Sequence, residues 1–154
     1  MSGESASKED VKVGDKMPDG TIYAGTSPDT QQPMFATPAD APGTYTFNGA
    51  ARYATNLDAH GHQDWRPPTK AELNVLFNNR AAIGGFDLGR YIGTDWYWNA
   101  GPAIPGYEPS PYSSAAKYWS SSSSSPLEAS FQSFGDGYRS DFGKNIDFHV
   151  RCVR

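Results

Sequence analysis

Alternating hydrophobic and polar positions predict several short strands along the chain. In the first third, a strand over residues 21–25 and a second over 33–37 are separated by a turn, so we expect a hairpin. Residues 128–134 and 148–153 alternate in the same way and are the best strand candidates of the second half. The pattern therefore favours short strands over a purely helical protein.

Two other stretches have the spacing of amphipathic helices. Apolar residues recur at helical intervals over residues 48–59, and Asn48 is the expected N-cap of this helix. A second helix over 69–79 begins with a capping box, in which Thr69 and Glu72 each satisfy the other's backbone amide. Its buried face is predicted to consist of Leu73, Leu76 and Phe77.

Residues 83–125 contain many Gly, Pro, Tyr and Ser residues and few periodic apolar runs, which predicts a long loop region with short strands. The serines at 120–125 follow Trp119 and precede ordered alternation, so we expect a structured strand edge there and not a flexible linker. Asp136-Gly137 then predicts a hairpin turn after the strand at 128–134.

The composition adds that these elements form one α+β domain with many loops. The chain has 154 residues, of which 37% are hydrophobic and 14% aromatic, together with 16 glycines and 12 prolines. This length is enough for one domain with its own core. We expect residues 1–10 to be a disordered tail, because they are small, polar and charged, and residues 11–154 to be the domain.

The charge excludes some classes of partner. A net charge of -4 supplies no basic stripe for phosphates, which argues against nucleic acid and anionic membrane surfaces. No apolar run approaches the ~18 residues of a membrane span, so membrane insertion is not expected. Proteins and small ligands remain as partners, while the compartment and the oligomeric state stay open.

Candidate catalytic residues are few. Cys152 is the only cysteine, and its place in an alternating segment indicates a small buried hydrophobe. His60, His62 and Asp64 offer metal-ligand types, but a turn after the first helix is favoured, since two histidines without a clear third ligand are a weak zinc signal. Nucleophile motifs and phosphate-binding glycine loops are lacking, so we expect no enzyme activity, cofactor or metal.

Other side chains have two interpretations. Three aspartates could coordinate calcium but are favoured as turn formers, because they lie among glycines and asparagines. Trp65 and Trp119 are interpreted as core anchors, whereas the roles of Trp96, Tyr97 and Trp98 stay open between core and ligand platform. The three aspartates are Asp136, Asp141 and Asp147.

Three motifs in combination resemble a bacterial and phage family with a C-type-lectin-like fold. They are DWRPPTKAEL at residues 64–73, YWSS at 118–121 and VRCVR at 150–154. The resemblance covers about residues 20–154 and implies two helices packed on short antiparallel strands with long loops. The structural residues that it implies are Trp65, Arg66, Thr69, Glu72, Trp119 and Cys152.

Members of that family include the variable proteins of diversity-generating retroelements, in which asparagine codons diversify at their adenines. Such codons never yield Lys, Gln, Glu, Met or Trp, so Gln132 and Lys144 are expected to be fixed scaffold. The resemblance thus implies a recognition domain for a protein or cell-surface ligand, with a mixture of aromatic and short polar residues that suits a paratope. The variable, ligand-binding residues would be Phe131, Tyr138, Ser140, Asp141, Phe142, Asn145, Ile146, Asp147 and His149.

Two features depart from related proteins of this fold. Calcium-dependent sugar lectins carry Glu-Pro-Asn or Gln-Pro-Asp before Trp-Asn-Asp, whereas here residues 98–100 (WNA) precede residues 108–110 (EPS), so calcium-bound sugar is not expected. Formylglycine-generating enzymes use two cysteines, and this chain has one. The alternatives are a structural adhesin or virion component without diversification, or a metal-dependent enzyme relative using the histidines near residue 60.

Two apolar residues can be interpreted either as surface or as core side chains. Phe142 and Ile146 lie in residues 141–147, a segment without clean alternation and rich in turn formers. This pattern favours surface positions for both side chains.

Overall fold

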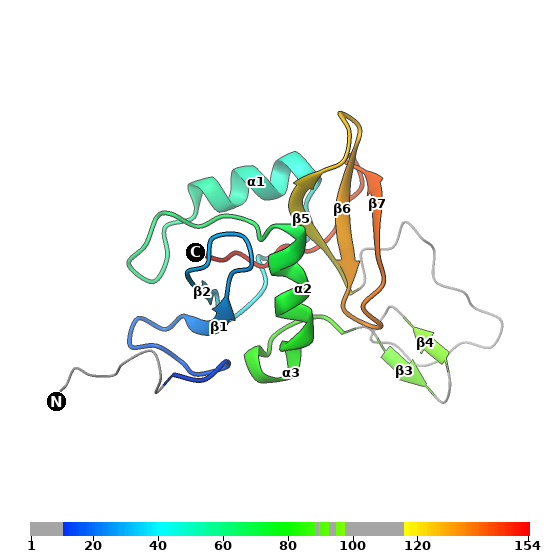
Figure 1. Ribbon diagram of the computed structural model, residues 1–154. Coiled ribbons are helices and arrows are strands. Elements are labelled where there is room, and N and C mark those ends of the chain that lie inside the picture. The colour runs from blue at the N-terminus through cyan, green and yellow to red at the C-terminus, as the bar shows by residue number, and fades with distance from the viewer. Residues whose placement is uncertain (1–10, 89, 93–94, 98–115) are drawn as a thin grey trace, which may run out of the picture.

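The computed structural model describes residues 11–88, 90–92, 95–97 and 116–154, with side-chain burial for residues 11–88 and 116–154. Within these ranges the protein is α+β, as expected, with three helices and three small antiparallel sheets (Figure 1). The predicted tail at residues 1–10 lies outside the described residues, as do the WNA and EPS segments. The side chains of Trp96, Tyr97 and Trp98 are also outside them.

The first hairpin forms as the sequence predicts. Strand β1 (Ile22–Thr26) pairs antiparallel with β2 (Pro33–Ala36), and the register shifts at Gly25, where φ is 103°. A positive φ of this size favours glycine, which explains the residue at the bulge.

Helix α1 (Phe47–Asn56) starts and ends earlier than its apolar spacing predicts. The predicted N-cap is wrong, because Thr46 and not Asn48 caps the helix. The hydroxyl of Thr46 accepts a hydrogen bond from the backbone N–H of Gly49 at 3.1 Å, and its backbone is extended. Both residue types cap helices well, so type alone does not distinguish them.

Replacing Thr46 with Ala is expected to lower the free energy of unfolding by about 1 kcal/mol, because an amide in the first turn loses its acceptor. The matched control is Asn48→Ala in the same turn, at an exposed position, with an expected change within about 0.5 kcal/mol. Urea denaturation of both variants measures the difference. A larger loss of unfolding free energy for Asn48→Ala than for Thr46→Ala would instead identify Asn48 as the N-cap, as the sequence predicts.

Helix α2 (Lys70–Asn78) has the predicted capping box, and Asn79 is its C-cap. Leu73 and Leu76 are buried as expected, and Phe77 is half-buried against the same cluster. A short helix that the sequence pattern did not predict, α3 (Arg80–Ile83), follows directly.

The main sheet has the order β5-β6-β7, formed by β5 (Lys117–Ser123), β6 (Glu128–Ser133) and β7 (Arg139–Gly143). The serine run therefore begins inside an edge strand, as predicted, and β5 starts before residue 125, where the predicted loop region ends. A small hairpin of β3 (Arg90–Ile92) and β4 (Asp95–Tyr97) precedes this sheet. The turn at Asp136-Gly137 is confirmed, and β7 after it was not predicted.

The segment at 148–153 is extended but is not a strand of a sheet. It makes isolated bridges instead: Phe148 with Tyr45, His149 with Tyr118, and Val153 with both Ala36 and Arg66. The segment passes from the sheet to β2 and ends near it (Figure 1). Because its backbone partners belong to several elements, it ties together parts that are distant in sequence.

Two apolar clusters hold this arrangement together. The first contains Leu73 and Leu76 of α2 and the first hairpin, packed against Tyr118 and Phe134. The second joins Ala50 of α1 to the opposite face of the main sheet, and its largest members are Trp119, Phe131 and Phe148. The final segment contributes to both, since Val150 belongs to the second cluster and Val153 to the first.

Candidate functional site

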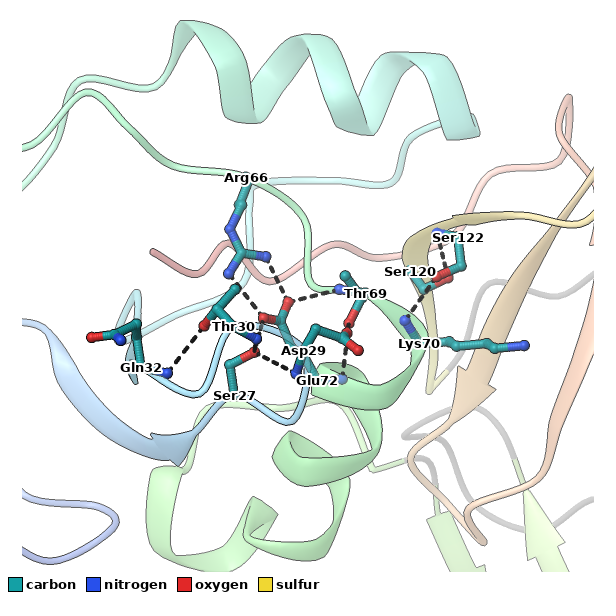
Figure 2. A network of polar contacts seen from close by, with 10 residues as sticks. All are labelled: Ser27, Asp29, Thr30, Gln32, Arg66, Thr69, Lys70, Glu72, Ser120 and Ser122. Atoms are coloured by element: carbon teal, nitrogen blue, oxygen red, sulfur yellow. Dashed lines mark hydrogen bonds and ion pairs between the residues drawn. The ribbon is translucent and has the colours of Figure 1, made fainter.

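The first sequence motif forms a partly buried ion pair at the start of α2 (Figure 2). Glu72 has no exposed surface, and both of its oxygens accept from the Arg66 guanidinium, at 2.6 and 2.9 Å. Ser27 donates its hydroxyl to the same carboxylate at 2.5 Å, and the backbone N–H of Thr69 donates at 2.9 Å. The pair is bidentate and joins the β1–β2 turn to the helix.

Two opposing effects act on the pKa of Glu72. Burial favours the neutral acid, but the hydrogen bonds from Arg66, Ser27 and Thr69 outweigh it and lower the pKa to about 2. Glu72 is therefore ionised at neutral pH, although it is buried.

The first and last motifs contact each other directly. Arg66 and Val153 exchange backbone hydrogen bonds of 2.9 and 2.8 Å. Arg154 donates two hydrogen bonds to the Asp64 carboxylate, at 2.6 and 3.0 Å. These contacts explain why the two motifs occur together, because each supplies backbone or charge partners to the other.

The remaining motif residues are core. Trp119 is fully buried and donates its indole N–H to the Tyr45 carbonyl at 2.8 Å. Trp65 is 3% and Cys152 is 2% exposed, and both pack with Ala54 of α1. The interpretation of these three residues as core is confirmed.

The Cys152 thiol is expected to resist alkylation in the native protein. Burial raises its pKa to about 12, so almost no thiolate is present at pH 8. Iodoacetamide at pH 8 should leave the folded protein unmodified within an hour and modify it fully in 6 M guanidinium, as measured by intact mass. Rapid labelling of the folded protein at pH 8 would contradict this burial.

The residues predicted to vary are divided between two faces of the main sheet. The register of β6 and β7 pairs Phe131 with Ser140, and Ser130 with Asp141. Directly opposite residues share a face. Ser140 therefore lies with Phe131 on the face of the Trp119 cluster, whereas Asp141 lies on the other face and accepts from the Ser130 hydroxyl at 2.7 Å.

Phe131 departs from the expectation of an exposed ligand residue. Its side chain is only 6% exposed and packs against Phe148, with ring centroids 5.0 Å apart. Phe142 and Ile146 are half-buried against the same cluster, so the surface interpretation holds for only part of each side chain. These three residues support the hairpin from the core side.

Other predicted residues project outward from the hairpin and the loop after it. Tyr138 is 60% exposed, and its ring lies 6.3 Å from that of Phe131. Asn145 and Asp147 are exposed in the turn after β7, and Ser140 is half-exposed. Together with Asp141, these side chains form what we call the outer hairpin surface, which consists of Tyr138, Ser140, Asp141, Asn145 and Asp147.

His149 lies apart from the outer hairpin surface. Its backbone pairs with β5, which is the opposite edge of the sheet from β7. The ring packs on Tyr118 at 5.2 Å, and Nε2 lies 3.1 Å from the Asp87 carboxylate. Codon compatibility placed it in the variable set, but the fold separates it from the outer hairpin surface.

A groove of about 200 Å³ lies on the α2 side of the sheet, next to the outer hairpin surface. It contains Asp141 and Ser140 from the predicted set, but also polar residues that the sequence analysis did not select as ligand residues. The latter include Lys70 at the start of α2, Ser120, Ser130, Gln132 and Arg139. No motif signals this groove, because it forms only when α2 packs on β5 and β6 beside β7.

Among the described groove residues, one buried side-chain atom lacks a hydrogen-bond partner. Gln132 is 1% exposed, and its amide N–H groups donate to the Gly137 carbonyl at 3.2 Å and the Asn74 side chain at 3.1 Å. Since a backbone carbonyl only accepts, this contact fixes which end of the amide is nitrogen. The other end, Oε1, has no hydrogen-bond donor, which costs about 1–3 kcal/mol for a buried polar group.

The histidines near residue 60 do not form a metal site with Asp64. His62 Nε2 lies 2.8 Å from the Asp19 carboxylate, and Asp64 pairs with Arg154. In residues 11–88, 90–92, 95–97 and 116–154, no group of three or more His, Cys, Asp or Glu side chains is arranged to hold a metal ion. The hypothesis of an enzyme relative thus loses its proposed third ligand.

Comparisons with known proteins give one assignment. A family model described as the Lcl C-terminal domain matches residues 22–154. No curated protein matches the chain. Within the part of the chain that the structure describes, none of the helices combines the length and apolar character needed to cross a membrane.

Proposed function

For this chain, which belongs to the Lcl C-terminal domain family, we propose the function of a non-catalytic recognition domain for a protein or cell-surface ligand. Its scaffold would be C-type-lectin-like, and its C-terminal stretch would be diversified by a retroelement. The ligand would bind the outer hairpin surface. The α+β architecture and the three motifs that resemble retroelement variable proteins support this proposal.

The observation that carries the proposal is the contrast between buried and exposed side chains of the β6–β7 hairpin and the turn after it. Phe131 and Trp119 hold it from the core, while Tyr138, Asn145 and Asp147 project into solvent. A tyrosine beside short polar side chains offers rigid contact area and adaptable hydrogen bonds, as paratopes do. Exchange of such residues changes the ligand without removing support from the fold.

The experiment that tests this function is a displayed library. Tyr138, Asp141, Asn145 and Asp147 are randomised together, and the library is selected against hen lysozyme as a fixed target. We expect binders with micromolar or tighter Kd whose Tm lies within about 5 °C of the parent. Phe142 and Ile146 stay unchanged, because their half-buried side chains contact the core.

The matched control library randomises four exposed positions on α1, namely Ala51, Arg52, Thr55 and Asn56. The proposal predicts that this library yields no binders, or binders at least tenfold less often. Equal success on α1, or loss of folding in most hairpin variants, would remove the outer hairpin surface as the recognition site.

A further inference from the structure

The groove beside the outer hairpin surface carries an inference about the kind of ligand. It deepens the recognition function proposed above and rests on it. Among the described residues, no acceptor takes a hydrogen bond from the Lys70 ammonium or from the Arg139 guanidinium. Two cations for which the described ranges supply no partner therefore line a groove in a protein of net charge -4.

The polar groups of the groove have a definite order. Gln132 and Arg139 are directly opposite each other on β6 and β7, and Ser130 and Asp141 form the next pair on the same face. Opposite Cβ atoms lie about 4.5–5.5 Å apart, and two residues along a strand span about 7 Å. A cation and the Gln132 acceptor thus occupy one end, while the Asp141 carboxylate lies about 7 Å further along.

Local structure holds the backbone of Lys70 near the Ser130–Asp141 pair, because Ser120 donates its hydroxyl to the Ser130 carbonyl at 2.8 Å. The Lys70 backbone N–H donates to the Ser122 hydroxyl at 3.0 Å, and the Ser122 N–H donates to Ser120 at 3.0 Å. Figure 2 shows its side chain extending away from the Glu72 network, so its charge is not used there. The ammonium is available to an anion.

From this arrangement we propose that the groove binds the free carboxyl terminus of a peptide chain. The terminal carboxylate pairs with Arg139, the Lys70 ammonium approaches it along the groove from the Asp141 end, and the N–H of the same residue donates to Gln132 Oε1. The N–H of a preceding residue reaches Asp141, since extended peptide advances about 3.3–3.6 Å per residue. Leu73 supplies an apolar wall for the last side chain.

The size of the groove favours a chain end over a larger ligand. Its volume of about 200 Å³ is below the roughly 300–1,000 Å³ of pockets for drug-sized molecules. Gln132 Oε1 is shielded from water, so a donor reaches it when a neighbouring side chain moves aside. Arg139 is exposed and lies directly across from Gln132, and we infer that it makes this movement when it turns to the carboxylate.

The test uses NMR titration of the full chain with three N-acetylated peptides. The first is tetra-alanine with a free carboxyl terminus, the second is its C-terminal amide, and the third is an amide with one internal aspartate. We expect the free acid to shift the amides of Ser130, Gln132 and Asp141, with a Kd at least tenfold lower than for either amide.

Charge variants supply the controls. Arg139→Gln and Lys70→Gln are each expected to weaken binding of the free acid about fivefold or more. Arg52→Gln removes the same charge from exposed α1 and should leave it unchanged. Equal binding of the amidated tetra-alanine, preference for the internal aspartate, shifts elsewhere or no shift at millimolar peptide would each overturn the carboxyl-terminus assignment. A hairpin library that yields no binders would instead contradict the proposed recognition function itself.

Discussion

Replacing Glu72 with Ala is expected to lower the free energy of unfolding by about 2–4 kcal/mol. The variant leaves the Arg66 guanidinium without its bidentate partner and removes the acceptor used by Ser27 and by the Thr69 amide. Because the Arg66 side chain is 38% exposed, water compensates part of its lost partner, and the cost lies below that of a fully buried pair. Urea denaturation followed by tryptophan fluorescence measures the loss.

The matched control is Glu128→Ala, which removes an exposed carboxylate from the start of β6. Its expected change is within about 0.5 kcal/mol. If both variants lost the same small amount of stability, the Arg66–Glu72 pair would not stabilise the fold.

The same pair has a pH dependence with a definite sign. The pKa of Glu72 is lowered in the folded protein to about 2 from an ordinary value of 4.5, so unfolding takes up a proton in acid. The stabilisation is complete at pH values above 4.5 and is lost as the pH falls toward 2. Glu72→Gln should therefore flatten the decrease in stability between these two pH values relative to the parent protein.

Replacing Trp119 with Ala is expected to cost about 3–5 kcal/mol and to lower Tm by roughly 6–20 °C. The ring is fully buried between α1 and the sheet, and lies 4.7 Å from the Phe148 ring and 5.6 Å from that of Phe47. Its loss leaves a cavity and removes the indole donor to the Tyr45 carbonyl. Differential scanning calorimetry gives the shift directly.

An exposed hydrophobic residue beside the same sheet serves as the comparison. Leu127 is 79% exposed before β6, so Leu127→Ala should change the free energy of unfolding by less than about 0.5 kcal/mol. A Trp119→Ala variant as stable as Leu127→Ala would mean that the second cluster does not support the hairpin.

The parts of the fold that could be predicted from the sequence are those fixed by local chemistry. The capping box of Thr69 and Glu72, the turn at Asp136-Gly137 and the first hairpin depend on neighbouring residues, and all three are present. The error at the N-cap of α1 has a similar origin, because Thr46 and Asn48 are both good caps and only the backbone conformation distinguishes them.

Long-range pairing explains what the sequence pattern missed. The segment at 148–153 alternates like a strand, yet its partners are β5, Tyr45, Ala36 and Arg66, none adjacent in sequence. Alternation reports which side chains are buried and does not report which backbone they meet.

Only part of the candidate site could be predicted from the sequence, because residue type does not report where the fold places a side chain. Codon compatibility selects residue types, so it includes Phe131, which is buried, and His149, which lies at the other edge of the sheet. Arg139 lies in no motif, and Lys70 lies in the first motif without a ligand role; only the packing of α2 on the sheet brings them to one groove. Exposure therefore narrows the predicted set to the outer hairpin surface.

The measurement that tests the central claim most directly is sequencing of the locus around this gene. If the outer hairpin surface is diversified, a near-repeat of the final coding segment lies beside a reverse-transcriptase gene and differs only where the repeat has adenine. The differing codons should include those of Tyr138, Asp141, Asn145 and Asp147, while the codon of Trp119 stays identical. A locus without the repeat, or with mismatches spread over all four bases, would contradict the claim.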